Sequence, residues 1–161
     1  MIPSLLLGNT KVTQDSIPYI IAEIGVNHEG DLDLGKKLID LAKEGGANAA
    51  KFQTYKANTI ASKNSPSYWD ISKEKTKSQY ELFLKYDTFN EKEYSILYEH
   101  CKQNQIDFIS TPFDHFSVDI KNRQNLQIWV IGKNTKELIK SMINIGKNTG
   151  ENDKLELCGW P

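Results

Sequence analysis

The sequence predicts an α/β protein built around a parallel β-sheet. Strand-like apolar runs at 17–25, 49–55 and 106–114 alternate with helical patterns in the segments between them. Strands that are covered on both faces, as in parallel sheets, have nearly continuous apolar sequences, and alternation with helices is typical of α/β folds. At 161 residues the chain is long enough for one domain, or part of one, with a real core.

The N-terminal segments predict a hairpin followed by a βαβ unit. "LLLGNTKV" at 5–12 is typical of a hairpin around Gly8-Asn9, and "IPYIIAEIG" at 17–25 is the first strand. A helix that ends at Gly45-Gly46 is predicted next, because apolar residues recur there at i, i+4, i+7 and i+8. These residues are Leu34, Leu38, Leu41 and Ala42. The strand at 49–55 completes a crossover of the usual length.

The second half begins with a long polar loop, predicted for 56–80 with short helical turns. Asn90 and Glu93 form a capping-box pattern at the start of the next helix. Its apolar stripe is predicted to face the core and consists of Tyr94, Leu97, Tyr98 and Cys101. The strand at 106–114 follows. Beyond residue 120, "IWVIG" at 128–132 predicts one more strand, and "NTKELIKSMINIGK" at 134–147 predicts an amphipathic helix.

The overall composition narrows the class of protein. Twenty Lys and Arg against 21 Asp and Glu give a formal net charge of -1 without a basic block, which argues against a nucleic-acid partner. The N-terminal segment has the features of neither a secretory signal nor a membrane anchor, so we expect no membrane association and a cytoplasmic location. Cys101 and Cys158 are expected to be reduced thiols, and no His/Cys spacing suggests a structural metal.

Charged and polar residues lie at or near the C-terminal ends of the predicted strands. Glu23, Lys51 and Thr111 belong to three successive strands, and Gln53 shares a face with Lys51 because strand side chains alternate with a period of two. Ligands bind at this rim in parallel α/β sheets and barrels. A lysine there can bind phosphate or carboxylate, and a neighbouring glutamate can handle protons. A purely structural ion pair between Glu23 and Lys51 is an equally open interpretation.

The three histidines give weaker indications of a functional site than these four residues do. His28 follows the first strand and can reach a ligand, but a single histidine in a polar loop is more often simply solvated. His100 lies off the apolar stripe of its helix, and His115 has no partner near it in the sequence.

Three motifs resemble the N-terminal part of the sialic acid synthase family, which comprises N-acetylneuraminate synthases and their legionaminic and pseudaminic relatives. They are "AEIGVNH" at 22–28, "KFQT" at 51–54 and "STPF" at 110–113, and the resemblance runs from about Leu5 to Asp119. Residues 67–83, "SYWDISKEKTKSQYELF", look closer to the sialic and legionaminic branch than to the pseudaminic one.

The resemblance implies a (β/α)8 TIM barrel followed by a small antifreeze-like domain, in a domain-swapped homodimer. It implies condensation of phosphoenolpyruvate with an N-acetylated amino sugar in its aldehyde form, such as N-acetylmannosamine or a legionaminic acid precursor, with release of phosphate. A divalent metal, Mn or Mg, polarises the aldehyde in that family. Glu23 would handle protons or the attacking water, Lys51 and Thr111 would bind the phosphate, and Gln53 would contact the sugar.

The chain departs from the family pattern in length. A TIM barrel needs roughly 250 residues, so residues 1–120 correspond to the first three to four βα units with an N-terminal hairpin. Residues 121–161 form an atypical segment. Its predicted helix resembles one near the end of the family's barrel, which fits an internal deletion, and unrelated sequence after a truncation is the alternative. The family's metal-binding histidines have no counterpart, so no metal ligand is assigned. Two hypotheses follow: a synthase of this type, or a truncated, non-catalytic remnant or split-enzyme fragment that folds or binds only with a partner, through an open sheet edge.

Overall fold

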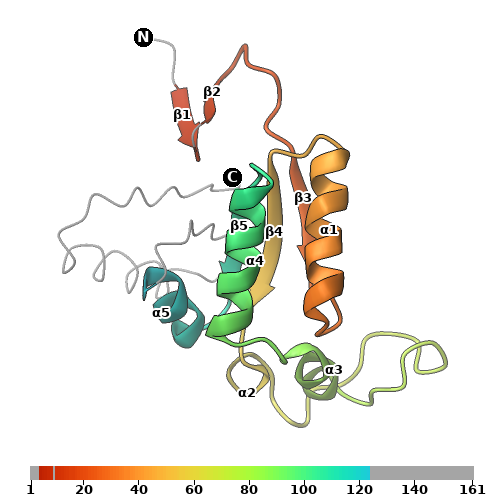
Figure 1. Cartoon of the computed structure of the whole chain (residues 1–161). Helices are drawn as coiled ribbons and strands as arrows, with labels where there is room; N and C mark the ends of the chain where they lie inside the picture. Colours follow the sequence, from red (N-terminus) through yellow and green to blue (C-terminus); the bar gives the residue numbers. More distant parts are fainter. Residues whose placement is uncertain (1–3, 9, 124–161) are drawn as a thin grey trace.

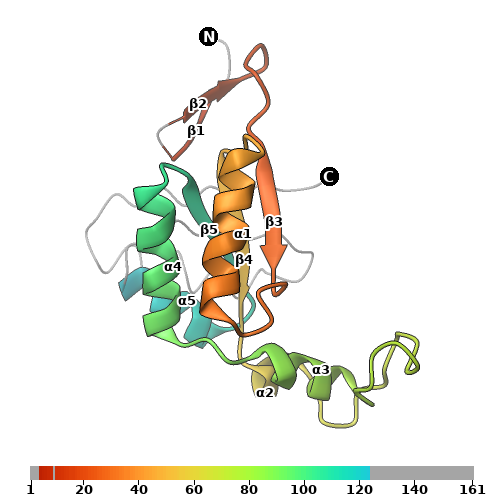
Figure 2. The same cartoon turned by 45° about the vertical axis from the view of Figure 1, so that its right-hand side comes forward.

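The computed structural model describes residues 4–8 and 10–123, and it confirms the predicted α/β fold with a parallel sheet. Strands β3 (Ile21–Gly25), β4 (Ala49–Thr54) and β5 (Asp107–Pro112) pair in parallel in the order β3-β4-β5. Helices α1 (Leu32–Glu44) and α4 (Glu91–Gln103) cover one face of this sheet (Figures 1 and 2). That these are the first units of a barrel stays a prediction. The strand at 128–132 and the helix at 134–147 lie outside the described residues.

The N-terminal hairpin is confirmed. Strands β1 (Ser4–Leu7) and β2 (Thr10–Thr13) pair antiparallel and lie near the N-terminal ends of the parallel strands (Figure 1). Leu7 packs with Ala49 and Ile109, on the sheet face away from the helices. The hairpin therefore covers the N-terminal part of that face.

The first strand is shorter than predicted. β3 begins at Ile21 rather than at residue 17, and Ile17 is almost fully exposed. Pro18 has no N–H to donate to a ladder, which explains why this stretch stays outside the sheet. The other two strands differ from the predicted bounds by only one or two residues.

Helix α1 forms where predicted, with Asp31 as N-cap and Gly45 as C-cap, but its buried face is not centred on the four periodic apolar residues. Ile39 is fully buried, whereas Leu41 is exposed. Two residues along a helix correspond to about 200°, so these two side chains point in nearly opposite directions. Tertiary packing selects the face of Gly35 and Ile39, against α4.

Helix α4 confirms both of its sequence signals. Asn90 and Glu93 form the capping box. Tyr94, Leu97 and Cys101 are buried, and Tyr98 packs against the same core. That core lies between the sheet and the two helices, with Phe52 stacked on Phe108 at 5.3 Å between ring centroids.

The long polar connection after β4 extends past the C-terminal ends of the strands (Figure 1). It carries α2 (Ala57–Ile60), in agreement with the predicted loop with short helical turns, and α3 (Gln79–Tyr86), which lies mostly beyond residue 80 and was not predicted. Helix α5 (His115–Arg123) follows β5 and was not predicted. No helix among the described residues is long and apolar enough to cross a membrane.

Candidate active site

The four predicted site residues lie on the sheet face away from α1 and α4. Glu23 is the register partner of Lys51, and Gln53 is the register partner of Thr111. Their neighbour Phe52 points into the helix-side core, and because side chains alternate along a strand, Lys51 and Gln53 point to the opposite face. The two pairs lie at successive levels, about 7 Å apart along the strands.

Lys51 and Glu23 form an ion pair across β3 and β4. The Lys51 side chain is 15% exposed and that of Glu23 is 48% exposed. The prediction of a strand covered on both faces is therefore wrong at Glu23; within 4–8 and 10–123, the hairpin covers this face near the N-terminal ends of the strands. The carboxylate is half-exposed, which removes most of the cost of placing a charge in an apolar strand.

Gly25 leaves space above this ion pair. Its φ of +57° lies in the left-handed region, and the pairing of β3 with β4 shifts register between Glu23 and Gly25. A Cβ at this position would lie 3.5 Å from Oε1 of Glu23 and 3.7 Å from Nε2 of Gln53. The two side chains thus converge on the bare backbone of this glycine.

Thr111 contributes a buried hydroxyl to the site. The residue is 5% exposed, and its Oγ1 has no hydrogen-bond partner among the described residues. Buried hydroxyls are nearly always paired, so one beside Gln53 without a partner among the described residues is a candidate for binding a ligand. Below it, Ile109 is the register partner of Lys51 and packs with Ala49 as an apolar floor.

Residues that the sequence did not single out hold this part of β4 in place. The Tyr94 hydroxyl donates to the Gln53 carbonyl at 2.9 Å, and burial raises the pKa of this phenol, which keeps it protonated. The hydroxyls of Thr54 and Ser110 bond at 2.6 Å. These contacts join residues 41 and 56 positions apart, so no local pattern could reveal them.

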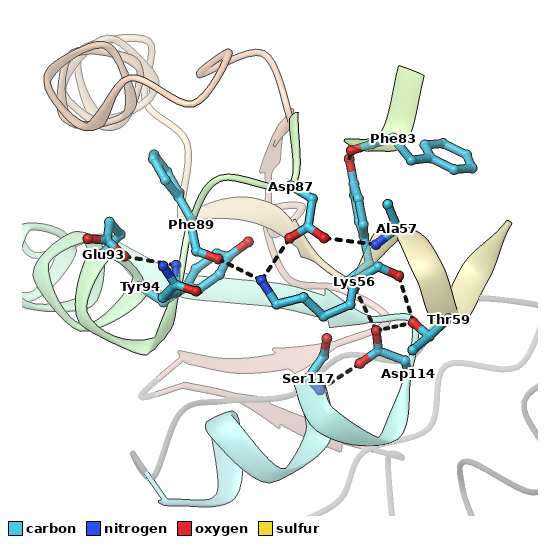
Figure 3. A network of polar contacts seen from close by, with 12 residues as sticks. Lys56, Ala57, Thr59, Phe83, Asp87, Phe89, Glu93, Tyr94, Asp114 and Ser117 are labelled. Carbon is cyan, nitrogen blue, oxygen red and sulfur yellow. Dashed lines mark hydrogen bonds and ion pairs between the residues drawn. The ribbon is translucent and has the colours of Figure 1, made fainter. Parts of the chain in front are cut away.

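A polar network surrounds the strand ends just beyond the site (Figure 3). Lys56 Nζ donates to Asp87 Oδ1 at 2.8 Å and lies 3.4 Å from the Phe89 carbonyl oxygen. The Ala57 N–H donates to Asp87 Oδ2 at 2.8 Å. Asp87 follows α3 and bonds to residues 56 and 57, so it links the end of the connection that carries α2 and α3 to its beginning.

His28 is not solvated, contrary to the prediction. It is 1% exposed, and its ring stacks on Phe89 with 4.2 Å between centroids. Nδ1 accepts a hydrogen bond from the Gly30 N–H at 3.1 Å, and Nε2 has no partner among the described residues. Burial lowers the pKa of the ring to about 4, so it is neutral at physiological pH. The side chain belongs to the helix-side core.

The described residues do not fit the metal that the resemblance implies. No three His, Cys, Asp or Glu side chains in 4–8 and 10–123 are grouped closely enough to hold an ion. Besides the buried His28, His100 pairs with Asp40 at 2.7 Å on the outer side of α4 and α1, and His115 is exposed at the start of α5.

Comparison with known proteins identifies relatives of the chain. Residues 38–150 match the NeuB family. An N,N'-diacetyllegionaminic acid synthase from Legionella pneumophila is 44% identical over 103 residues, which are 63% of this chain and 29% of that protein. The N-acetylneuraminate-9-phosphate synthase of Homo sapiens is 31% identical over 114 residues, covering 71% of this chain and 32% of that protein. The chain thus spans about a third of the length of these relatives.

A solved structure agrees with the fold. The N-acetylneuraminic acid synthetase from Leptospira borgpetersenii, crystallised with citrate, superposes with a TM-score of 0.67 at 26% identity, over 93% of this chain and 57% of that one. The resemblance deduced from the motifs is confirmed. The family match extends to residue 150, past the point near residue 120 where the motifs alone placed its end. The division into segments 1–120 and 121–161 stays a prediction.

Proposed function

The chain belongs to the NeuB family, and on that basis we propose that it supplies the phosphoenolpyruvate-binding part of a cytoplasmic synthase in nonulosonic acid biosynthesis. The reaction joins phosphoenolpyruvate to an N-acetylated amino sugar in its aldehyde form and releases phosphate. The observation that carries the proposal is the arrangement of the Glu23–Lys51 pair one level from Gln53 and the unpaired hydroxyl of Thr111.

The Lys51 ammonium and the Thr111 hydroxyl are the two groups suited to the phosphate of the substrate. Lysine binds phosphate as a point charge, and the unpaired hydroxyl can donate one hydrogen bond to it. Because the ion pair with Glu23 is partly exposed, it is weak, and a multiply charged phosphate can displace the carboxylate. Gln53, whose amide approaches Gly25, is assigned to the sugar.

Glu23 is assigned to proton transfer. When C3 of phosphoenolpyruvate attacks the aldehyde carbon, the aldehyde oxygen takes a proton from solvent and C2 becomes cationic. Water adds to C2 and one of its protons passes to the freed carboxylate of Glu23. The tetrahedral intermediate then breaks its C2–O bond to phosphate, and the departing phosphate takes the remaining hydroxyl proton as the 2-keto acid forms. The carboxylate of Glu23, beside Lys51, is the group placed to accept that proton. No metal-dependent step is assigned to the described residues.

The length of the chain supports a second candidate. A fragment that spans about a third of its relatives can bind phosphoenolpyruvate without completing the reaction, either as a remnant or as part of a split enzyme. Both the synthase and the fragment would bind phosphoenolpyruvate at Lys51, but only the synthase would turn it over.

Two measurements separate these candidates. The first is phosphoenolpyruvate binding by calorimetry, and the second is phosphate release with manganese and either N-acetylmannosamine or the diacetylated hexose precursor of legionaminic acid. Lys51→Ala is compared with Lys36→Ala, which removes a surface lysine that pairs with Asp33 at 3.5 Å. Binding and release that are lost only in Lys51→Ala support a synthase, and binding without release supports the fragment. Absence of binding to the unaltered protein refutes both.

A further inference from the structure

Asp114 connects three segments at the C-terminal rim of the sheet (Figure 3). Its Oδ2 accepts from the Lys56 N–H at 2.7 Å and lies 2.6 Å from the Thr59 hydroxyl, and its Oδ1 accepts from the Ser117 N–H at 2.7 Å. The residue is 8% exposed. One carboxylate thus joins the end of β4, the start of α2 and the first turn of α5.

These bonds continue the pairing of β4 with β5 beyond the sheet. The last backbone bond between them runs from the Phe113 N–H to the Thr54 carbonyl at 3.0 Å. Two residues after Thr54, the Lys56 N–H donates to the Asp114 side chain instead of to a backbone carbonyl. The carboxylate therefore links the two chains just past their last register pair, Thr54 and Pro112, and three residues beyond the Gln53–Thr111 pair.

The bonds require an ionised carboxylate. Burial opposes ionisation of Asp114, but hydrogen bonds from Ser117, Thr59 and the Lys56 N–H hold the pKa of its carboxyl below the usual value. A carboxylate offers acceptor sites on both oxygens, whereas the amide of asparagine would direct an NH2 group at one of the donors. The isosteric asparagine therefore disrupts the link without changing its shape.

A helix cap alone does not account for this geometry. Capping α5 needs only the bond to the Ser117 N–H. The other oxygen is directed at residues 56 and 59, which follow β4. Asp87 holds the same lysine by its side chain, so the chain after Gln53 is fixed from two sides.

We propose that Asp114 is a positioning residue, which fixes the C-terminal ends of β4 and β5 so that Gln53 and Thr111 stay in register at the site. The role in ligand binding rests on the proposed function, because Thr111 there binds the substrate phosphate. Thr111 makes no side-chain hydrogen bond of its own among the described residues, so its hydroxyl is placed by the backbone of β5, which the ladder with β4 holds along the strand and Asp114 holds beyond its end.

Asp114→Asn is the test, and Asp31→Asn is its matched control. Asp31 also follows a strand at this rim and caps a helix, accepting from the Asp33 and Leu34 N–H groups at 2.8 and 3.1 Å, but these bonds stay within its own helix. Amide hydrogen exchange is measured for residues 51–54 and 109–111 under conditions where both variants have the same free energy of unfolding. Phosphoenolpyruvate affinity is measured in parallel.

We expect exchange in these strand ends to rise about tenfold in Asp114→Asn and to stay unchanged in Asp31→Asn, with a similar tenfold loss of phosphoenolpyruvate affinity in Asp114→Asn only. Equal exchange in both variants overturns the proposal. If the unaltered protein binds no phosphoenolpyruvate, the proposed function fails while exchange still decides the positioning role. If Asp114→Asn does not fold, Thr59→Val takes its place, because it removes one contact to the carboxylate. Amide exchange at the strand ends is measured again. A rise smaller than tenfold supports the role of Asp114, and no rise overturns it.

Discussion

Mild acid should destabilise this fold through His28. The ring is buried against Phe89, and burial lowers its pKa from 6.5 to about 4. Protonation would place a charge in the core and convert Nδ1, which accepts from the Gly30 N–H, into a donor. Because the neutral ring is favoured in the folded state, the unfolded chain binds more protons at mildly acidic pH. Stability is therefore full above pH 6.5 and is lost as pH falls toward 4.

The size of the effect follows from the two pKa values. A lowering from 6.5 to about 4 corresponds to about 3.4 kcal/mol in total, at 1.36 kcal/mol for each pKa unit. Integrated between pH 7 and pH 5, the free energy of unfolding should fall by about 2 kcal/mol through this residue. The carboxyl of Asp114, whose pKa is lowered, loses its contribution at lower pH, as the pH falls from the ordinary aspartate pKa through the lowered one.

Urea denaturation followed by circular dichroism at pH 7, 6 and 5 would measure this slope, and His28→Phe is the informative variant. Phenylalanine keeps an aromatic ring against Phe89 and loses the acceptor for the Gly30 N–H, at a cost of about 1 kcal/mol. The variant should therefore be less stable than the unaltered protein at pH 7 and more stable at pH 5. Parallel pH dependences in the two proteins, or an NMR titration of His28 with a pKa of 6 or above, would refute the reasoning.

Two further changes test the turn and the hairpin. Gly30→Ala should destabilise the protein by at least 1 kcal/mol more than Gly46→Ala, by urea denaturation: both glycines have φ near +80°, but only at Gly30 would a Cβ clash, 2.5 Å from the Thr88 hydroxyl. Equal losses would rule out the clash. Tyr19→Phe removes the hydroxyl that donates to Asp107 and should cost about 1.5–3 kcal/mol, with faster amide exchange in the hairpin. A loss confined to the hairpin amides, without a change in unfolding free energy, would show that the bond does not stabilise the sheet.

The sequence predicted those parts of the fold that depend on local signals. The N-terminal hairpin, the Asn90–Glu93 capping box and the three parallel strands each depend on a few neighbouring residues, and all of them form. Features set by tertiary packing were predicted less well. Which side of α1 is buried depends on where α4 lies, and for that reason Ile39 rather than Leu41 faces the core.

In the candidate site, too, the features that depend on local signals were predicted and those that depend on tertiary packing were not. Strand alternation was enough to place Lys51 and Gln53 on one face, and parallel strand order brought Glu23 and Thr111 to them. The residues that hold these side chains were missed, because bonds such as that from the Tyr94 hydroxyl to the Gln53 carbonyl join distant segments. His28 was misjudged because a polar loop can fold its one histidine under an aromatic ring, and no spacing in the sequence indicates this.

The exposure of the Glu23–Lys51 pair connects its structural and functional interpretations. A fully buried pair would stabilise its own geometry, since removing either partner would leave an uncompensated charge in a dry interior. Here the carboxylate is half-exposed, so the pair contributes little to stability, and Lys51 can exchange its partner for a ligand at low cost. The lysine itself remains 15% exposed above the apolar floor at Ile109, where a phosphate would bind it in a less polar setting than water. An ion pair with this asymmetry suits a site in which the lysine is paired with a carboxylate until an anionic ligand replaces that carboxylate.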